Sequence, residues 1–237
     1  MRHRIRYDES QLFLIDADDT LWEDNVYFER AISTFIEFLN HPEYSFDQVR
    51  VVLNDIERRY IRTHGYGLNC LVSSFVETFE QLSIEPVTPE LHRTIHAFGQ
   101  IVTEHPLELL PGVAETLDYL AGRHRLILVT KGHVDVQTDK LDRSGLRGYF
   151  ADVEIVREKT SAVYRDIAAR CDAHPGSTWM VGNSPRSDIN PALVAGLNAV
   201  LIPHNQTWML ELEQLAEPQS PSQLLVLERF GDLVQHF

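Results

Sequence analysis

Residues 12–21 read Leu-Phe-Leu-Ile-Asp-Ala-Asp-Asp-Thr-Leu, and this stretch decides the fold. It opens with four consecutive apolar residues, Leu12–Ile15. Such a run, without polar alternation, is typical of a strand that is buried on both faces, as in a parallel sheet. Three carboxylates and a hydroxyl follow it, in Asp16, Asp18, Asp19 and Thr20. Because open parallel sheets bind ligands beyond the carboxyl ends of their strands, the stretch predicts a strand that leads into a binding site.

Four more short apolar runs follow later in the chain, separated by helical patterns. The runs are Leu126–Val129, Val153–Val156, Trp179–Val181 and Ala199–Ile202. The helical patterns are Val113–Ala121, Val136–Arg143, Ala162–Cys171 and Asp188–Ala195. Alternating strands and helices at this spacing predict an α/β fold with a Rossmann-like, doubly wound parallel sheet. After Pro221 we expect a last edge strand and a closing helix.

Residues 23–105 interrupt this alternation with helical periodicity alone. Apolar residues recur at helical spacing in four pieces, which lie near residues 28–39, 49–60, 71–79 and 91–98. Prolines separate the pieces. We therefore expect an all-helical cap domain at 23–105, inserted into an α/β core domain that is made of residues 1–22 and 106–237.

The amino-acid composition limits the kinds of partner that we expect for this protein. The 237 residues include 21 Lys and Arg against 35 Asp and Glu, a net charge of −14. A surface this acidic repels nucleic acid and anionic lipid, so we expect neither nucleic acid nor a membrane as a partner. Cys70 and Cys171 form no disulfide framework or zinc site. Leu12–Ile15 is too short for a signal peptide or a membrane span, so we expect a cytoplasmic protein, either a monomer or a homodimer.

Polar and charged residues follow each of the predicted strands. Thr130 and Lys131 come after the second strand, Lys159 stands in the turn after the third, and Asn183, Ser184 and Asp188 follow the fourth. The carboxyl ends of parallel strands meet at one edge of the sheet. These side chains are therefore expected to converge there with those that follow Ile15.

The spacing of Asp16 and Asp18 has a chemical meaning. Carboxylates two residues apart on an extended segment point the same way and repel, unless a cation or a shared proton relieves them. Mg²⁺ takes oxygen ligands of this kind together with substrate phosphate. One carboxylate can then act as a nucleophile while the other donates or accepts a proton. The simpler interpretation is a helix cap or an Asx turn after the strand.

Together these residues resemble the four motifs of the haloacid dehalogenase (HAD) superfamily. Asp16–Leu21 is similar to the first motif, DxDx[TV][LV], and Gly182–Asp188 resembles the fourth, GDxxxxD. Thr130 and Lys159 are similar to the residues of the second and third motifs. The resemblance covers the whole chain, and the helical insertion lies where the family's C1-type cap lies.

The resemblance implies a role for each of these residues. Asp16 would be the nucleophile that forms an aspartyl-phosphate, and Asp18 would be the general acid and then the general base. Thr130 would donate its hydroxyl to a phosphoryl oxygen, and Lys159 would neutralise the crowded anions. Mg²⁺ would be held by four residues, namely Asp16, Asp18 through its backbone carbonyl, Asn183 and Asp188.

Two positions refine what the resemblance implies. Dehalogenases of the family lack an acid at the position of Asp18, since a halide leaving group needs no proton, so Asp18 favours phosphoryl transfer. The family usually has Asp where this chain has Asn183. Either the Asn183 amide oxygen binds Mg²⁺ without a charge, or Asn183 only shapes the turn and Asp188 anchors the metal.

The sequence thus predicts a Mg²⁺-dependent phosphomonoester hydrolase that acts on a small soluble phosphate ester. Two alternatives remain, a phosphomutase of the same fold and a catalytically silent phosphate-binding protein. Expected substrate-binding residues are Thr130, Lys131, Lys159 and, in the helical insertion, Arg62, His64 and Tyr66. The segment from Arg62 to Tyr66 is interpreted either as a loop that selects the substrate or as a plain turn between helices.

Overall fold

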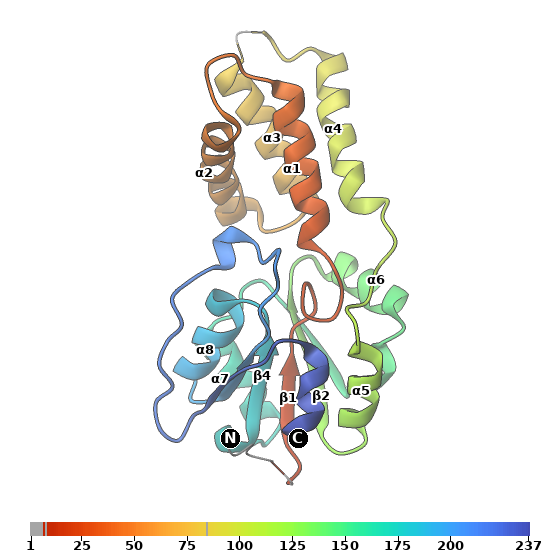
Figure 1. Ribbon diagram of the computed structural model, residues 1–237, viewed down its shortest axis with the longest axis vertical. Coiled ribbons are helices and arrows are strands. Elements are labelled where there is room, and N and C mark those ends of the chain that lie inside the picture. The colour runs from red at the N-terminus through yellow and green to blue at the C-terminus, as the bar shows by residue number, and fades with distance from the viewer. Residues whose placement is uncertain (1–6, 8, 84) are drawn as a thin grey trace. The chain divides into compact units, whose positions relative to one another are not determined.

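The computed structural model describes residue 7 and residues 9–83 and 85–237 (Figure 1). The chain divides into two compact units, which we call the α/β unit (Met1–Asn25 and Leu107–Phe237) and the helical unit (Val26–Pro106). Residues 1–6 and 8 of the expected core domain lie outside the described residues. No helix in the described part of the chain combines the length and apolar character that a membrane-spanning helix needs.

The α/β unit contains a six-stranded sheet in which all neighbouring strands are parallel, in the order β3-β2-β1-β4-β5-β6. The strands are β1 (Leu12–Ile15), β2 (Arg125–Lys131), β3 (Asp152–Val156), β4 (Thr178–Gly182), β5 (Asn198–Leu201) and β6 (Leu224–Val226). Ile15 pairs with Leu128 on one side and with Val181 on the other. Strands β2, β1 and β4 therefore run in register, and the residues that follow them meet at one edge of the sheet.

Helices cover both faces of this sheet (Figure 1). On one face, Phe13 and Ile15 pack in a cluster with α5 (Val113–Ala121), α6 (Val134–Ser144) and the closing 3₁₀ turn η5 (Phe230–Gln235). On the other face, Leu12 and Leu14 pack with α7 (Ser161–Arg170) and α8 (Asn190–Val194). Alternate residues of β1 thus enter different clusters, as expected for a strand buried on both faces. The predicted doubly wound α/β fold is confirmed.

The helix predicted at Asp188–Ala195 is wrong at its start. Residues Pro185–Ile189 form a π-helical turn, η3, and α8 begins only at Asn190. The Ser184 carbonyl accepts hydrogen bonds from Asp188 N at 3.0 Å and from Ile189 N at 3.1 Å, which widens the turn. The Ser184 hydroxyl caps the turn by accepting from Ser187 N at 2.9 Å. Turns of this kind occur often at functional sites.

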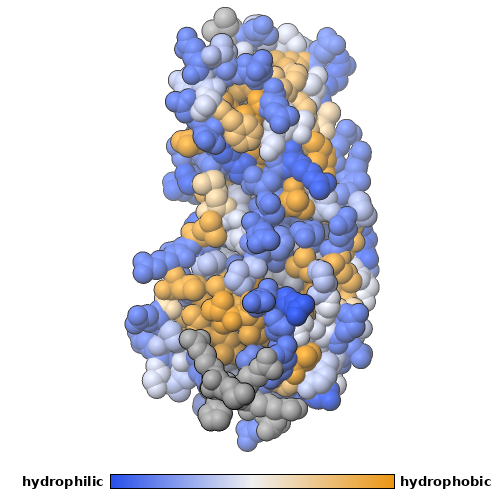
Figure 2. Space-filling view, viewed as in Figure 1, coloured by the Kyte–Doolittle hydropathy of each residue, from blue (hydrophilic) through white to orange (hydrophobic). Residues whose placement is uncertain are grey.

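Three 3₁₀ turns complete the α/β unit: η1 (Arg147–Tyr149), η2 (Pro175–Ser177) and η4 (Met209–Glu211). Figure 2 shows apolar side chains gathered on one face of this unit. Its exposed apolar residues include Val194, Leu212 and Val226, the last of them in β6. Because β6 is only three residues long, the sheet ends in a short strand, which limits pairing with other chains.

The helical unit consists of α1 (Asn25–Leu39), α2 (Phe46–His64), α3 (Leu68–Leu82) and α4 (Pro89–Thr103). Its core is built from apolar side chains of all four helices, and the rings of Phe35 and Phe75 stack with their centroids 4.4 Å apart. Ser45 begins α2 with a capping box, and Thr88 caps α4 ahead of Pro89. Each of the four helical patterns in the sequence corresponds to one of these helices.

One carboxyl group lies in the interior of the helical unit. Glu57 of α2 is 5% exposed, and its Oε2 has no hydrogen-bond partner. Burial raises the pKa of Glu57 to about 7, and the charge of Arg50 opposes this shift only in part. The folded chain therefore favours the protonated, neutral form of Glu57.

We predict that Glu57→Gln stabilises the chain at pH 8 and changes its stability little at pH 4.5. Because the folded-state pKa of Glu57 lies above its unfolded-state pKa, the free energy of unfolding of the wild type falls as the pH rises through this window. Because an amide does not ionise, the variant avoids this loss. Its free energy of unfolding at pH 8 should exceed that of the wild type by up to about 3 kcal/mol. Urea unfolding at both pH values measures it.

The matched control for this prediction is Glu80→Gln, which changes an exposed glutamate of the helical unit. It should leave the free energy of unfolding within about 0.5 kcal/mol of the wild type at both pH values. An equal effect of Glu57→Gln at the two pH values, or a loss of stability at pH 8, would contradict a raised pKa of Glu57 in the folded chain.

Candidate active site

Three charged side chains meet where β1 and β4 end. Asp16 directly follows β1, and its N–H continues the sheet by donating to the Val181 carbonyl at 2.9 Å. The Lys159 ammonium, from the loop before α7, donates to Asp16 Oδ1 and, at 2.8 Å, to Asp188 Oδ1. All three side chains are at most 8% exposed. The structure thus brings together three of the residues that the sequence singles out.

The charges of this triad do not balance. Two carboxylates flank one ammonium in a buried place, so one negative charge is left without a partner within the triad. Burial and the charge of Asp188 raise the pKa of Asp16 to about 7, although Lys159 acts in the opposite direction. Burial alone would lower the pKa of Lys159, but Asp16 and Asp188 raise it, which keeps the ammonium charged.

The position of Asp188 depends on a glycine. Asp188 is fully buried, and its Oδ2 accepts a hydrogen bond from Ser184 N at 3.0 Å. A Cβ atom on Gly182, the last residue of β4, would lie 2.2 Å from Asp188 Oδ2 and 2.5 Å from its Cγ. No side chain fits in that space. Gly182 therefore leaves the space in which the Asp188 carboxylate packs against the end of β4.

Asp18 lies in a different environment from Asp16. Its Oδ1 accepts hydrogen bonds from Trp22 Nε1 at 2.7 Å and from Lys140 Nζ at 3.0 Å, and its Oδ2 accepts one from Gln137 Nε2 at 2.9 Å. Burial alone would raise the pKa of Asp18, but Lys140 and these hydrogen bonds hold it below its usual value. The two carboxylates of the first motif thus have different partners and pKa values shifted in opposite directions.

The segment after the first motif is tied down by Asp19. Its Oδ1 accepts from Asp24 N at 2.9 Å and from Asn25 N at 3.0 Å. Its backbone has a φ of 58°, in the left-handed region that Asp tolerates better than most residues. Burial and the nearby Asp24 raise the pKa of Asp19 to about 8. Asp19 therefore holds the beginning of α1 in place.

Glu23 and His204 lie beside Asp19, and one ligand atom from each of the three lies within 4.8 Å of the others. These side chains already make polar contacts within the protein. His204 Nε2 is 3.2 Å from Glu23 Oε2, and His204 Nδ1 accepts from Gln206 N at 3.3 Å. The cluster is accounted for by these contacts between the first motif and the segment after β5.

Thr130 and Lys131 occupy the end of β2. Thr130 is 2% exposed. Lys131 is the last residue of β2. Its ammonium pairs with Glu211 and donates to Ser187 Oγ at 2.9 Å, and Glu211 Oε2 in turn accepts from Ser184 Oγ at 2.6 Å. Lys131 thus supports the turn that carries Asp188, and its expected contact with substrate stays a prediction.

Asn183 is 7% exposed and directly follows β4. Its Nδ2 donates to Thr207 Oγ1 at 3.2 Å, and this hydroxyl donates to the His204 carbonyl at 2.9 Å. The segment after β5 therefore orients the Asn183 amide. Both interpretations of Asn183, as an uncharged metal ligand and as a turn-former, are compatible with this bond.

The three expected specificity residues belong to the helical unit. Arg62 and His64 lie in the last turn of α2, and Tyr66 lies in the turn between α2 and α3. Gly65 has a φ of 83° and Gly67 one of 121°, so both depend on glycine's freedom in the left-handed region. Substrate binding by Arg62, His64 and Tyr66 stays a prediction.

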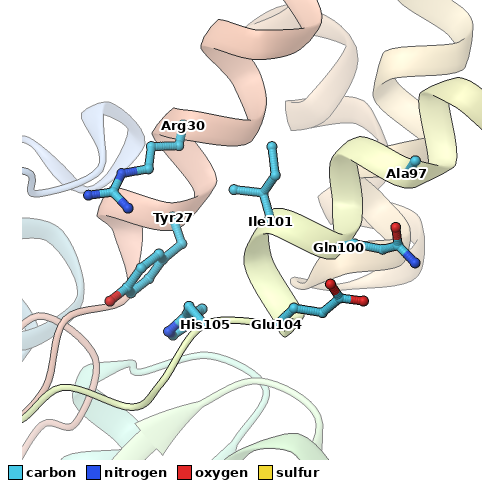
Figure 3. Close-up of a pocket in the computed structure, with 7 residues that line it drawn as sticks. All are labelled: Tyr27, Arg30, Ala97, Gln100, Ile101, Glu104 and His105. Carbon is cyan, nitrogen blue, oxygen red and sulfur yellow. The ribbon is translucent and has the colours of Figure 1, made fainter.

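A pocket of about 320 Å³ also lies in the helical unit, between the beginning of α1 and the end of α4 (Figure 3). The rings of Tyr27 and His105 stack in it, with centroids 3.3 Å apart and planes 10° apart. Arg30 and Glu104 are among the residues that line it (Figure 3). None of the residues that line it belongs to the predicted site.

Three residues at the site carry no expectation from the sequence, namely Gln137, Lys140 and Glu211. Gln137 and Lys140 are three residues apart in a helix that the sequence does predict, and that helix follows the strand that ends in Thr130 and Lys131. Side chains at this spacing share a helix face, so the sequence indicated that Gln137 and Lys140 point the same way. Glu211 lies in the 3₁₀ turn η4, where no pattern in the sequence pointed to it.

Comparisons with known proteins show which family this chain resembles. A family model described as haloacid dehalogenase-like hydrolase matches residues 11–196. The pyrimidine 5'-nucleotidase YjjG of Escherichia coli (strain K12) is 31% identical over 126 residues, which cover 50% of this chain and 52% of that protein. The match thus spans about half the length of this curated relative.

Solved structures share the fold over almost the whole chain. A haloacid dehalogenase-like family hydrolase from Xanthomonas campestris has a TM-score of 0.77 at 25% identity, over 95% of this chain and 93% of that one. A predicted phosphoglycolate phosphatase from Haemophilus somnus 129pt has a TM-score of 0.61 at 20% identity, over 95% and 97% of the two chains. The chain belongs to the haloacid dehalogenase-like hydrolases, because their family model covers more than half of it.

We predict that Gly182→Ala displaces Asp188 and destabilises the chain by about 1–3 kcal/mol, the usual cost of overpacking a buried position. The reason is the 2.2 Å approach of the added Cβ atom to Asp188 Oδ2. Urea unfolding measures the change. Gly148→Ala is the matched control, since its Cβ would meet no atom within 4 Å. Equal stability of the two variants would contradict the packing described here.

Proposed function

We propose that this hydrolase is a phosphatase, a Mg²⁺-dependent phosphomonoester hydrolase that works through an aspartyl-phosphate on Asp16. The observation that carries the proposal is the different setting of the two carboxylates of the first motif. Asp16 faces Lys159 and Asp188, whereas Asp18 faces Trp22, Gln137 and Lys140. Phosphoryl transfer to a carboxylate with proton transfer to an alcohol requires two such groups with separate tasks.

The proposed reaction has two balanced steps. In the first, a carboxylate oxygen of Asp16 bonds to phosphorus while the bond to the leaving oxygen breaks, and that oxygen takes its electron pair and the proton of Asp18. In the second, Asp18 accepts a proton from water, the water oxygen bonds to phosphorus, and the bond to Asp16 breaks. Thr130 would donate to a phosphoryl oxygen, and the Lys159 ammonium would offset the charge of the carboxylates.

The oxygen atoms around the triad are suited to Mg²⁺. Carboxylates of Asp16 and Asp188, the backbone carbonyl of Asp18 and the amide oxygen of Asn183 are the hard oxygen donors that this ion prefers. The negative charge that Lys159 leaves unbalanced also favours a cation here. When bound, Mg²⁺ would stabilise negative charge on the transferring phosphoryl group.

The proposed substrate is a small phosphate ester, and a nucleoside 5'-monophosphate is the first kind to test. The support for it is the similarity to the pyrimidine 5'-nucleotidase YjjG. Arg62, His64, Tyr66 and Lys131 are proposed to contact the organic part or the phosphate. We also propose that the protein is cytoplasmic. It would be either a monomer or a homodimer.

We predict that the purified protein hydrolyses p-nitrophenyl phosphate in the presence of Mg²⁺ and that EDTA abolishes the activity. Asp16→Asn should lower kcat by at least about a thousandfold, because the amide cannot act as the nucleophile. Release of p-nitrophenolate measures the rate.

The matched control is Asp139→Asn, which changes an exposed aspartate on α6 and should leave kcat unchanged. Hydrolysis that persists in Asp16→Asn, or a wild type without activity at any Mg²⁺ concentration, would contradict the proposed function.

A further inference from the structure

Helix α6 holds Asp18 through two side chains that lie outside the four motifs. Lys140 Nζ donates to Asp18 Oδ1 at 3.0 Å, and Gln137 Nε2 donates to Asp18 Oδ2 at 2.9 Å. Residues three apart on a helix project from the same face, so both donors come from one rigid element. Trp22 Nε1 adds a third bond, to Oδ1. Both oxygens of Asp18 therefore have fixed donors.

The ammonium of Lys140 is itself fixed from a second side. It donates to Asp24 Oδ1 at 2.5 Å, so it lies between two carboxylates. The side chains of Lys140 and Asp24 are 16% and 14% exposed. Ion pairs with this little exposure keep one geometry better than surface pairs do. Asp24 is held in turn through its N–H by Asp19.

We propose that Lys140 is a positioning residue for phosphoryl transfer, and that its ammonium fixes the Asp18 carboxyl group in the orientation from which it exchanges a proton with the leaving oxygen and then with water. This inference rests on the proposed function and extends it to a residue that contacts neither phosphorus nor the leaving group. Lys140 acts through Asp18, and Asp24 keeps Lys140 in place.

The orientation of Asp18 matters in proportion to how strongly the leaving oxygen needs a proton. As the bond from phosphorus to the leaving oxygen breaks, an alkoxide takes up the proton of Asp18, whereas p-nitrophenolate is stable without one. General acid catalysis is worth about 10²–10⁴ in rate. A misplaced Asp18 should therefore slow the cleavage of alkyl phosphates more than the cleavage of p-nitrophenyl phosphate.

The test compares benzyl phosphate with p-nitrophenyl phosphate, which share an aromatic ring but differ in leaving group. The quantity measured is the ratio of kcat/KM for the two esters, because kcat/KM reports the step in which the leaving group departs. Lys140→Met should lower the ratio of benzyl to p-nitrophenyl ester at least about tenfold. Lys140→Arg, which keeps the charge, should restore most of it.

Two further variants make the test specific. Gln137→Leu removes the other donor from α6 and should lower the same ratio, so it carries the test if Lys140→Met does not fold. Arg143→Met changes an exposed residue one turn further along α6, whose NH1 pairs with Asp139, and should leave the ratio unchanged.

The outcomes separate this inference from the function on which it rests. A ratio that is unchanged or raised in both Lys140→Met and Gln137→Leu overturns the positioning role, and so does an equal loss of activity on both esters. A ratio that falls equally in Arg143→Met also overturns it. A wild type that hydrolyses neither ester overturns the proposed function itself.

Discussion

Three segments of the α/β unit depend on one buried ammonium. Lys159 reaches from the loop before α7 to Asp16 after β1 and to Asp188 in the turn after β4. Charged groups are stable away from water only when they are paired, and removing one partner of a buried pair costs about 3–5 kcal/mol. The ion pairs therefore fix the loop, the strand end and the π-helical turn relative to one another. The parallel register of β1 and β4 and the missing side chain at Gly182 make the arrangement possible.

Two neighbouring carboxylates of the first motif are held by different partners. Asp16 shares its ammonium with Asp188, and its pKa is raised to about 7 by burial and by that second carboxylate. Asp18 turns to α6, where burial is outweighed by Lys140 and its pKa is lowered. Two aspartates separated by one alanine thus differ in both partner and charge preference.

The sequence predicted the fold and the triad because both depend on local patterns. Buried apolar runs predicted the strands, and the carboxyl ends of parallel strands had to bring Asp16, Lys159 and Asp188 to one edge. The π-helical turn was missed because it depends on the Ser184 carbonyl accepting two N–H groups, which residue types do not reveal. Glu211 and Lys140 were missed because neither directly follows a strand: Glu211 lies in η4, and Lys140 projects from within α6.

The most direct test of this division of labour uses the Asp18→Asn variant with p-nitrophenyl phosphate. Its leaving group needs no proton, so Asp16 should still be phosphorylated, but without Asp18 as the base the covalent intermediate should persist. The account predicts a burst of one p-nitrophenolate per chain, and mass spectrometry of the acid-quenched protein should find the phosphoryl group on the peptide that contains Asp16. A phosphoryl group on another residue, or steady turnover at the wild-type rate without a burst, would contradict it.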